Sequence, residues 1–438
     1  MEAALIGFAV LLALVFLRMP IAFAMGFVGF AGFGFLSGFD PSLAMVGTLV
    51  SDTALSYGLS VVPMFILMGN FVARAGLSSE LYDASHAFLG HRKGGLSMAT
   101  IVACGGFSAI CGSSLATAAT MSKVALPPMR KYGYADTLAT ASVAAGGTLG
   151  ILIPPSVILV IYGLMTETSI RELFAAGFLP GLLGIVLYMA AVKFVVWRDP
   201  SAGPAAPKRD WAARMRALNG VWGTLLLFAV VMGGIYGGAF TPTEAAGIGA
   251  GGAFLIALFR GALTWRIFLD VLADSARTTA ILFTVLIGAL IFSNFVNRAG
   301  LPDGLLSLVT GNDLSPLTVI AIIIAIYIVL GCVFESLSML LLTIPVFFPV
   351  VKELSYAGLG GEDILVWFGI VAVVVTEISL ITPPVGLNVF VLSGVVKDVS
   401  TGTIFRGVTP FWCADIIRLA IIVAIPAISL FLPGLFYG

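Results

Sequence analysis

Apolar stretches long enough to cross a lipid bilayer follow one another along the whole chain. A membrane-spanning helix needs about 20 mainly apolar residues, so the polar breaks between stretches predict where such helices end. The expected helices cover residues 3–18, 20–38, 58–73, 175–197, 218–238, 241–259, 279–297 and 411–433. The longest polar stretch, about 198–218, is too short to form a soluble domain. The pattern therefore predicts an all-α polytopic membrane protein.

Two proline pairs interrupt apolar stretches: Pro154-Pro155 lies within residues 136–165, and Pro383-Pro384 lies within residues 363–396. Proline has no backbone N–H and its ring clashes with the preceding turn, so each pair predicts a broken helix. Such a break is stable in hydrocarbon only where protein or a water-filled cavity satisfies the freed backbone groups. Broken helices at corresponding places in two halves are typical of the binding site of a secondary transporter.

Two further apolar segments, residues 94–130 and 315–351, predict re-entrant helical hairpins, which enter the membrane and return to the same side. Basic residues flank the first segment and acidic residues flank the second, so the hairpins are expected to enter from opposite faces. The first tip, Cys111–Thr117, is small and polar, as a buried turn at membrane depth must be. The second tip is expected at Phe334–Ser338.

The two halves of the chain share a short block of sequence. Phe71–Leu77 matches Phe295–Leu301 at six of seven positions, and each block precedes a hairpin and then a proline pair. The positive-inside rule places the first block inside and the second outside, which predicts inverted repeats. If Arg18 is cytoplasmic, Arg418 and the other Lys and Arg residues also fall inside, except Arg171, Arg298 and Lys352. Both termini are then periplasmic.

Composition supports a polytopic membrane protein and argues against several other classes of function. The chain is 60% hydrophobic and 10% charged, its mean hydropathy is +1.11, and its net charge is zero, which argues against a nucleic-acid partner. No Walker A loop, HExxH or GxSxG motif is present, so the sequence supports no enzyme activity. The four cysteines lie in apolar runs without a CxxC pair and are expected to be free thiols.

The hairpin tips and helix breaks carry the candidate ligands. A broken helix leaves carbonyl groups that suit a sodium ion and N–H groups that suit an anionic substrate. The first half adds the hydroxyl groups of Ser108, Ser113, Ser114 and Thr117 and the carbonyl of Ile153. The second half adds Ser336, Ser338, Ser379, Thr382 and Asn388. Close helix packing is the alternative explanation for the small residues.

Two acidic residues, Glu335 and Glu244, have different expected roles. Glu335 lies in an apolar run, where an ionisable group is by default functional, and it is expected to ligate sodium, hold a proton or cap a helix. Glu244 follows Thr241-Pro242-Thr243 and is expected to cap the start of a helix. Residues 77–89 and 264–277 mix apolar and charged residues, which fits either interfacial arms or ordinary loop helices.

Several motifs together resemble the large membrane subunit of the tripartite ATP-independent periplasmic (TRAP) transporters. The resemblance covers essentially the whole chain. The motifs are Ala109–Thr120, Ala125–Met129, Ala144–Ser156, Phe240–Ala246 and Thr382–Asn388. It implies a sodium-coupled uptake system for organic acids with a two-hairpin elevator fold. Its expected partners are a small four-helix membrane subunit and a periplasmic substrate-binding protein.

The family's sodium sites, carried over to this chain, fall on two sets of residues. The first set is Ser108, Gly150, Ile153 and Pro155, and the second is Ser338, Ser379, Thr382 and Val385, largely through backbone carbonyls. The chain departs from the family at Glu335, where a shorter Asp is expected, and at Ser379, where Gly is expected. Both departures bear on ion affinity.

The sequence thus predicts co-transported Na⁺ and an organic acid anion as the ligands. Ser113 joins the two sodium sets, while the substrate is expected at Ser114, Thr117, Ser156, Glu335, Ser336 and Asn388. The predicted parts are N-terminal scaffold helices (1–57), a first repeat (58–197), a cytoplasmic loop (198–217), scaffold helices with an arm (218–278) and a second repeat (279–438). The expected location is the bacterial inner membrane. A stand-alone sodium–dicarboxylate symporter, an ion channel and a structural subunit are the alternatives.

Overall fold

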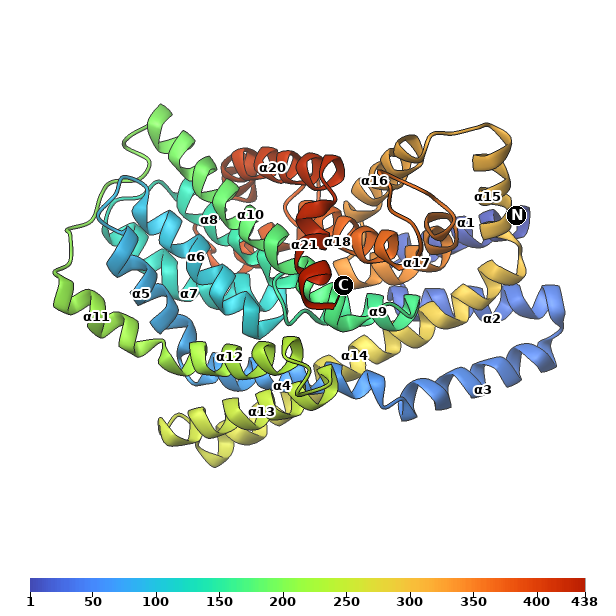
Figure 1. Ribbon diagram of the computed structural model, residues 1–438, viewed down its shortest axis with the longest axis horizontal. Coiled ribbons are helices and arrows are strands. Elements are labelled where there is room, and N and C mark those ends of the chain that lie inside the picture. The colour runs from blue at the N-terminus through green and yellow to red at the C-terminus, as the bar shows by residue number, and fades with distance from the viewer. Residues whose placement is uncertain (438) are drawn as a thin grey trace.

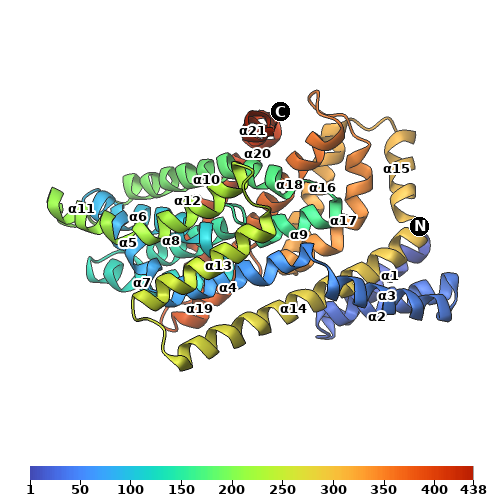
Figure 2. The same cartoon turned by 60° about the horizontal axis from the view of Figure 1, so that its bottom comes forward.

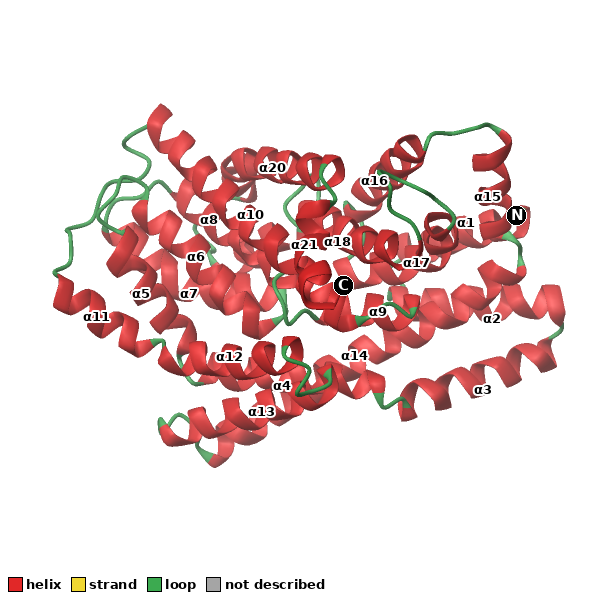
Figure 3. Cartoon of the chain, viewed as in Figure 1, coloured by secondary structure: helices red, strands yellow, loops and turns green. Residues whose placement is uncertain are grey.

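The computed structural model describes residues 1–437, which form helices joined by short loops and contain no β-strand (Figures 1 and 3). The first-half helices are α1 (Glu2–Phe16), α2 (Ile21–Ser37), α3 (Phe39–Leu55), α4 (Val61–Arg74), α5 (Leu77–Leu89), α6 (Gly95–Cys111), α7 (Ser114–Lys131), α8 (Asp136–Thr148), α9 (Val157–Thr166) and α10 (Ile170–Arg198). The others are α11 (Trp211–Gly220), α12 (Trp222–Tyr236), α13 (Pro242–Phe259), α14 (Trp265–Arg298), α15 (Leu301–Gly311), α16 (Pro316–Gly331), α17 (Ser336–Lys352), α18 (Gly361–Ser379), α19 (Leu387–Val395), α20 (Thr401–Ala424) and α21 (Ala427–Tyr437). The all-α prediction is confirmed.

Helix length and composition fit a protein of many membrane passages. Within residues 1–437, four helices are long and apolar enough to cross a bilayer: α10, α13, α14 and α20. Two bent pairs, α3 with α4 and α11 with α12, raise the number to six if each pair counts as one span. Most other apolar helices are 10–17 residues long, as expected where helices are paired or broken inside the protein.

The proline pairs break two helices, as predicted. α8 ends at Thr148, a 3₁₀ turn covers Leu149–Ile151, and α9 begins at Val157. α18 ends at Ser379 and α19 begins at Leu387. Each proline pair lies in the gap and contains a cis peptide bond. Each segment predicted to form a hairpin consists of two contacting helices: α6 with α7, and α16 with α17.

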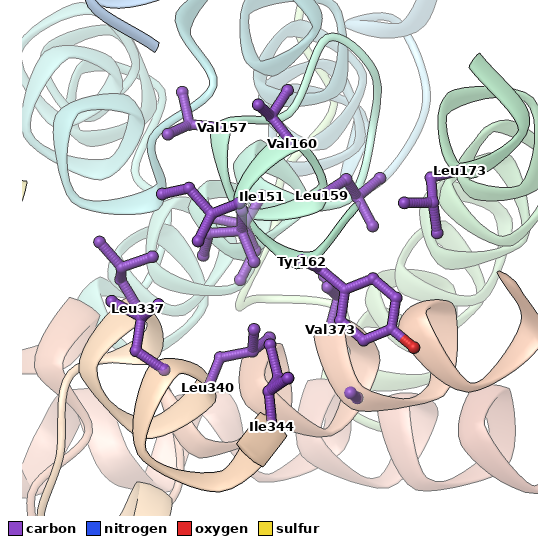
Figure 4. Packing of buried hydrophobic residues seen from close by; sticks show 14 of the residues in the cluster. Ile151, Val157, Leu159, Val160, Tyr162, Leu173, Leu337, Leu340, Ile344 and Val373 are labelled. Carbon is purple, nitrogen blue, oxygen red and sulfur yellow. The ribbon is translucent and has the colours of Figure 1, made fainter. Parts of the chain in front are cut away.

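The two halves interlock through the second part of each broken helix. α9 packs against α17 and α18, and α19 packs against α7 and α8. Figure 4 shows Leu337, Leu340 and Ile344 of α17 beside the α9 residues. The Tyr162 hydroxyl on α9 donates a hydrogen bond to the Leu365 carbonyl at 2.7 Å. In the reverse direction, Asn388 Nδ2 on α19 donates to the Ala144 carbonyl at 3.0 Å.

Arg130 ties the end of α7 to both halves outside the apolar region. Its guanidinium lies 2.9 Å from Asp136 at the start of α8 and 2.9 Å from Asp398, which follows α19. The hydrogen bond from Arg130 holds the pKa of the Asp398 carboxyl below its ordinary value. Asp398 is therefore ionised at neutral pH.

The repeated sequence block forms the same turn in both halves. α4 ends at Arg74 and α14 ends at Arg298, and Ala-Gly follows each of them. Gly76 and Gly300 have φ values of +78° and +67°, a region that favours glycine. Each of these glycines precedes the first residue of the next helix, α5 or α15. The block therefore encodes a helix–turn–helix corner.

Several predicted boundaries are wrong. Helix α15 lies where no helix was expected, and α11 begins within the predicted loop 198–217. Residues 39–55 form α3, which begins directly after Gly38, although no helix was expected there. The expected arm 264–277 and helix 279–297 are one continuous helix, α14, because no glycine or proline separates them before residue 288 (Figure 2). The last helix, predicted at 411–433, begins earlier, because Ser400 caps the start of α20. It is also divided into α20 and α21, because Pro426 ends α20.

The capping prediction for Glu244 is confirmed. Thr241 Oγ1 accepts a hydrogen bond from the Glu244 N–H at 3.3 Å, and the Glu244 carboxylate accepts one from the Thr241 N–H at 2.8 Å. This reciprocal pair is a capping box at the start of α13. Glu244 is thus explained by local structure.

Helices α2 and α14 cross at very short range. A Cβ built on Gly29 would lie 2.6 Å from the Phe292 backbone nitrogen, which is closer than real Cβ contacts allow. The absence of a side chain at Gly29 therefore allows the two backbones to meet. α14 also packs against α3, α4 and α17, so this crossing positions much of the surrounding helical frame.

We expect Gly29→Ala to destabilise the protein, because the added methyl group forces α2 and α14 apart, at a cost of about 1–3 kcal/mol. Thermal unfolding of the purified chain in detergent measures this as a lower melting temperature. Gly47→Ala is the matched control, because a Cβ on Gly47 of α3 has no neighbour within 4 Å. Equal melting temperatures for Gly29→Ala and the wild type would contradict the close crossing.

Candidate functional site

The first helix break is held open by a serine cap. Ser156 precedes α9, and its Oγ accepts a hydrogen bond from the Leu159 N–H at 3.3 Å. The same hydroxyl donates to the Ile151 carbonyl, at the end of the 3₁₀ turn that follows α8. Ser156 therefore satisfies one freed carbonyl and one freed amide of the break.

The first hairpin tip lies directly against this break. α6 ends at Cys111 and α7 begins at Ser114, with Ser113 as its N-cap. A Cβ on Gly150 would lie 3.0 Å from the Ser113 carbonyl oxygen and 3.2 Å from the Ser114 nitrogen. The tip and the break meet backbone to backbone, with no room for a side chain between them.

The second tip and the second break have the same relationship. α16 ends at Gly331, whose backbone contacts the Ser379 side chain at the end of α18. The Cys332 thiol donates to the Pro383 carbonyl at 3.6 Å. Each hairpin of the chain is thus seated against the broken helix of its own half, as the sequence pattern predicted.

Both tips line one cavity of about 830 Å³. The first tip contributes Ser113 and Ser114, and the second contributes Glu335, Ser336 and Ser338. Helices α2 and α14 supply an opposite wall that is mainly apolar. The cavity therefore brings together polar groups from segments more than 200 residues apart in the sequence.

Two buried serines near the tips have free hydroxyl groups. Ser108 on α6 is fully buried and Ser336 at the start of α17 is 3% exposed, and neither Oγ has a hydrogen-bond partner. An unpaired buried hydroxyl is costly, so each such group calls for an explanation. Both serines were predicted ligands, and both have an oxygen available for one.

Other predicted ligand hydroxyls are already engaged. Thr117 Oγ1 donates to the Ser113 carbonyl at 2.7 Å, and Ser379 Oγ donates to the Val375 carbonyl at 3.0 Å. Thr382 Oγ1 donates to the Ile378 carbonyl and accepts from Trp412 Nε1 at 2.9 Å. These oxygens keep a lone pair for a ligand but no free proton.

Glu335 is the N-cap of α17. Its carboxylate accepts hydrogen bonds from the Ser338 N–H and from Ser338 Oγ, each at 3.3 Å. Of the three roles expected for this residue, the structure shows the cap. Because Glu335 also lines the cavity, the cap places a carboxylate at the edge of the shared space.

The remaining predicted residues lie away from the cavity wall. Ile153 and Pro155 are buried in the first break, and Val385 is half-buried in the second. Thr117, Ser156 and Asn388, three expected substrate residues, do not line the cavity. Asn388 is fully buried where the two halves meet, and its Oδ1 has no hydrogen-bond partner.

Sequence reasoning missed a buried ionic network between the two breaks. Glu377 of α18 pairs with Arg418 of α20, and Arg418 Nη2 also lies 2.9 Å from Asp415 Oδ1. The Tyr188 hydroxyl of α10 lies 2.6 Å from Asp415 Oδ2 and 3.0 Å from Thr148 Oγ1, at the end of α8. All five side chains are fully buried.

The signal for this network was present in the sequence. Glu377, Asp415 and Arg418 each lie in an apolar stretch, where ionisable residues are rare and face partners within the protein. Arg418 was instead assigned to the cytoplasmic basic residues. That assignment is wrong, because its guanidinium lies fully buried between two carboxyl groups.

Two relatives with assigned functions match nearly the whole chain. The C4-dicarboxylate TRAP transporter large permease protein DctM of Pseudomonas aeruginosa is 37% identical over 408 residues, covering 90% of this chain and 91% of that protein. The sialic acid TRAP transporter large permease protein SiaM of Vibrio cholerae is 34% identical over 436 residues, covering 98% and 97%.

One solved structure and one family model also match the chain. The YdaH transporter of Alcanivorax borkumensis matches with a TM-score of 0.56 and 14% identity over 90% of this chain and 89% of that one, which shows a likeness of fold alone. The family model of the DctM component of the tripartite ATP-independent periplasmic transporters matches residues 8–428. The chain therefore belongs to this family of transporter permease subunits.

Proposed function

We propose that this chain is the transport subunit of a binding-protein-dependent TRAP system, which takes up an organic acid anion across the inner membrane by sodium symport. One observation carries the proposal: two hairpin tips, each seated against a broken helix, meet at a single cavity. Such a site offers carbonyl oxygens for a cation and helix N-termini for an anion.

Sodium ions would bind at the two junctions of tip and break. At the first junction the free hydroxyl of Ser108 would join carbonyls of Gly150, Ile153 and Pro155, with Ser113 at the tip. At the second, Ser338 and Thr382 would join the backbone of Ser379 and Val385. Sodium is a hard cation that favours oxygen ligands, and these positions offer only oxygen atoms.

The organic acid would bind in the cavity between the tips. α7 and α17 both begin there, and helix N-termini attract carboxylate groups. The Glu335 carboxylate occupies the start of α17, so a substrate carboxylate is favoured at the α7 end, near Ser113 and Ser114. C4-dicarboxylates and sialic acid, named for the two relatives, are the first substrate classes to test.

An elevator movement would carry the bound ligands. The helices around α2, α4, α13 and α14 would form a static frame, and the hairpins with the broken helices would form the mobile unit. The helix α5 joins frame to hairpin in sequence and packs against α4, α6 and α7. It would be one arm of the mechanism.

The small four-helix subunit and the periplasmic binding protein would complete the system.

The charge pattern would place both termini in the periplasm, and the fold is compatible with that. The Met1 ammonium donates to the Ala299 carbonyl, beside Arg298, and Phe436 stacks on Tyr236 at 5.3 Å, near the Arg171–Phe240 hydrogen bond. Each terminus therefore lies beside an arginine that the same rule places outside.

We expect Ser108→Ala to weaken the apparent sodium affinity of transport about tenfold, or about 1.4 kcal/mol, because it removes one ligand oxygen. The measurement is uptake against sodium concentration in proteoliposomes. Ser122→Ala is the matched control, because Ser122 is equally buried on the same hairpin but its hydroxyl already donates to the Ala119 carbonyl. Equal sodium curves for Ser108→Ala and the wild type would remove Ser108 from the site.

The proposal as a whole is tested by uptake of radiolabelled succinate and sialic acid. Proteoliposomes would hold this chain with its small partner, with or without the cognate binding protein and a sodium gradient. We expect uptake to need both the binding protein and the sodium gradient. Uptake that ignores the binding protein would indicate a stand-alone symporter, and single-channel currents would indicate a channel. Full activity of Thr382→Ala and Glu335→Gln together would contradict the assigned site.

A further inference from the structure

The buried network described above holds an unbalanced charge. With both carboxylates ionised, Glu377 and Asp415 contribute two negative charges and Arg418 contributes one positive charge. The titratable groups that face one another there are these three and Tyr188, while α8 adds only the hydroxyl of Thr148. A net charge sealed from solvent in a membrane protein is costly, so one more positive charge is needed.

Unpaired polar atoms show where the network is incomplete. Glu377 Oε1 and both Nε and Nη1 of Arg418 have no hydrogen-bond partner, and Asp415 Oδ1 has only its ion-pair contact with Arg418 Nη2, although each side chain is fully buried. Two ionised carboxylates would each seek several donors in such a place. In this arrangement neither carboxylate therefore has a full set of donors, because the unpaired N–H groups of Arg418 do not reach their oxygens.

The hydroxyl groups of Tyr188 and Thr148 indicate where a proton would lie. Thr148 Oγ1 donates to the Ala145 carbonyl at 2.8 Å, and the Tyr188 hydroxyl donates its one proton to Asp415 Oδ2 at 2.6 Å while that carboxylate is ionised. Both hydroxyl protons are then in use, so no proton lies in the 3.0 Å contact between Tyr188 and Thr148. A proton on Asp415 Oδ2 would complete the chain, because Tyr188 would then accept from Asp415 and donate to Thr148.

We infer that this network is a proton-binding site, with one exchangeable proton on Asp415 Oδ2. The proton completes a chain of donors from Asp415 through Tyr188 and Thr148 to the Ala145 carbonyl. Glu377 remains ionised as the partner of Arg418, and the network becomes neutral. No bond other than the O–H bond of the acid forms or breaks.

The position of the site gives the proton a role, and this part rests on the proposed function. Thr148 ends α8 two residues before Gly150, and Glu377 lies two residues before Ser379. Loss of the proton would make the Tyr188 hydroxyl donate to Asp415 and would break its hydrogen bond to Thr148. The presence or absence of the proton would therefore change hydrogen bonds beside both predicted sodium junctions.

Infrared spectroscopy of the purified chain tests the proton without any need for transport. The wild type should show the C=O band of a buried carboxylic acid at neutral pH, and the band should shift in D₂O. Asp415→Asn should remove it. Glu377→Gln should also remove it, because Asp415 then becomes the ionised partner of Arg418. Arg418→Gln should raise the band about twofold, since both acids must then be neutral.

Two controls assign the band. Asp398→Asn should leave it unchanged, because Asp398 is ionised and exposed. In the Glu335→Gln background, Asp415→Asn should remove the same band intensity that it removes from the wild type. A wild type without the band, or a band that persists in Asp415→Asn, would overturn the inference. A band that appears only when sodium is removed would assign the balancing charge to a sodium ion instead. The wild-type spectrum decides even if a variant fails to fold.

Discussion

The two breaks in α8–α9 and α18–α19 leave backbone amides and carbonyls inside an apolar medium, and the rest of the structure is arranged to give those groups partners. An unpaired backbone group in hydrocarbon costs several kcal/mol. Ser156 and the Asn388 N–H, which bonds the Leu380 carbonyl, satisfy part of this demand within the breaks. The hairpin tips close over the remainder, which explains why small residues, with no bulk to hold the backbones apart, occupy those positions.

The same demand explains the polar contacts between the halves. Tyr162 and Asn388 each carry a hydrogen bond into the first part of the other half's broken helix. The Glu377–Arg418 pair and its neighbours join α8, α10, α18 and α20 at the level of the breaks. A change at one junction therefore has a continuous polar route to the other. In a core that is otherwise apolar, such a route is a strong constraint on how the halves move.

Local signals in the sequence predicted local structure. The helix breaks at the proline pairs and the turn at Gly112-Ser113 were predictable, because proline and glycine act on the backbone within a few residues. The shared cavity and the ionic network were not, because they depend on which distant segments meet. α3 was missed because Asp40, Pro41 and Asp52 interrupt its hydrophobic pattern. Arg418 was misplaced because a rule based on loops was applied to a buried residue.

The uninterrupted length of α14 has a consequence for the surrounding lipid. At about 1.5 Å per residue, its 34 residues extend about 50 Å, well beyond a hydrocarbon layer about 30 Å thick. The helix must lean strongly or run partly along the interface, where Arg266, Asp270 and Asp274 reach water. Its lean is then set by its packing against α2, α3, α4 and α17 and by these charged residues. Because α2 is held against α14 at Gly29, a change in the lean of α14 would carry α2 with it, and the lipid around both helices would have to adapt to that lean.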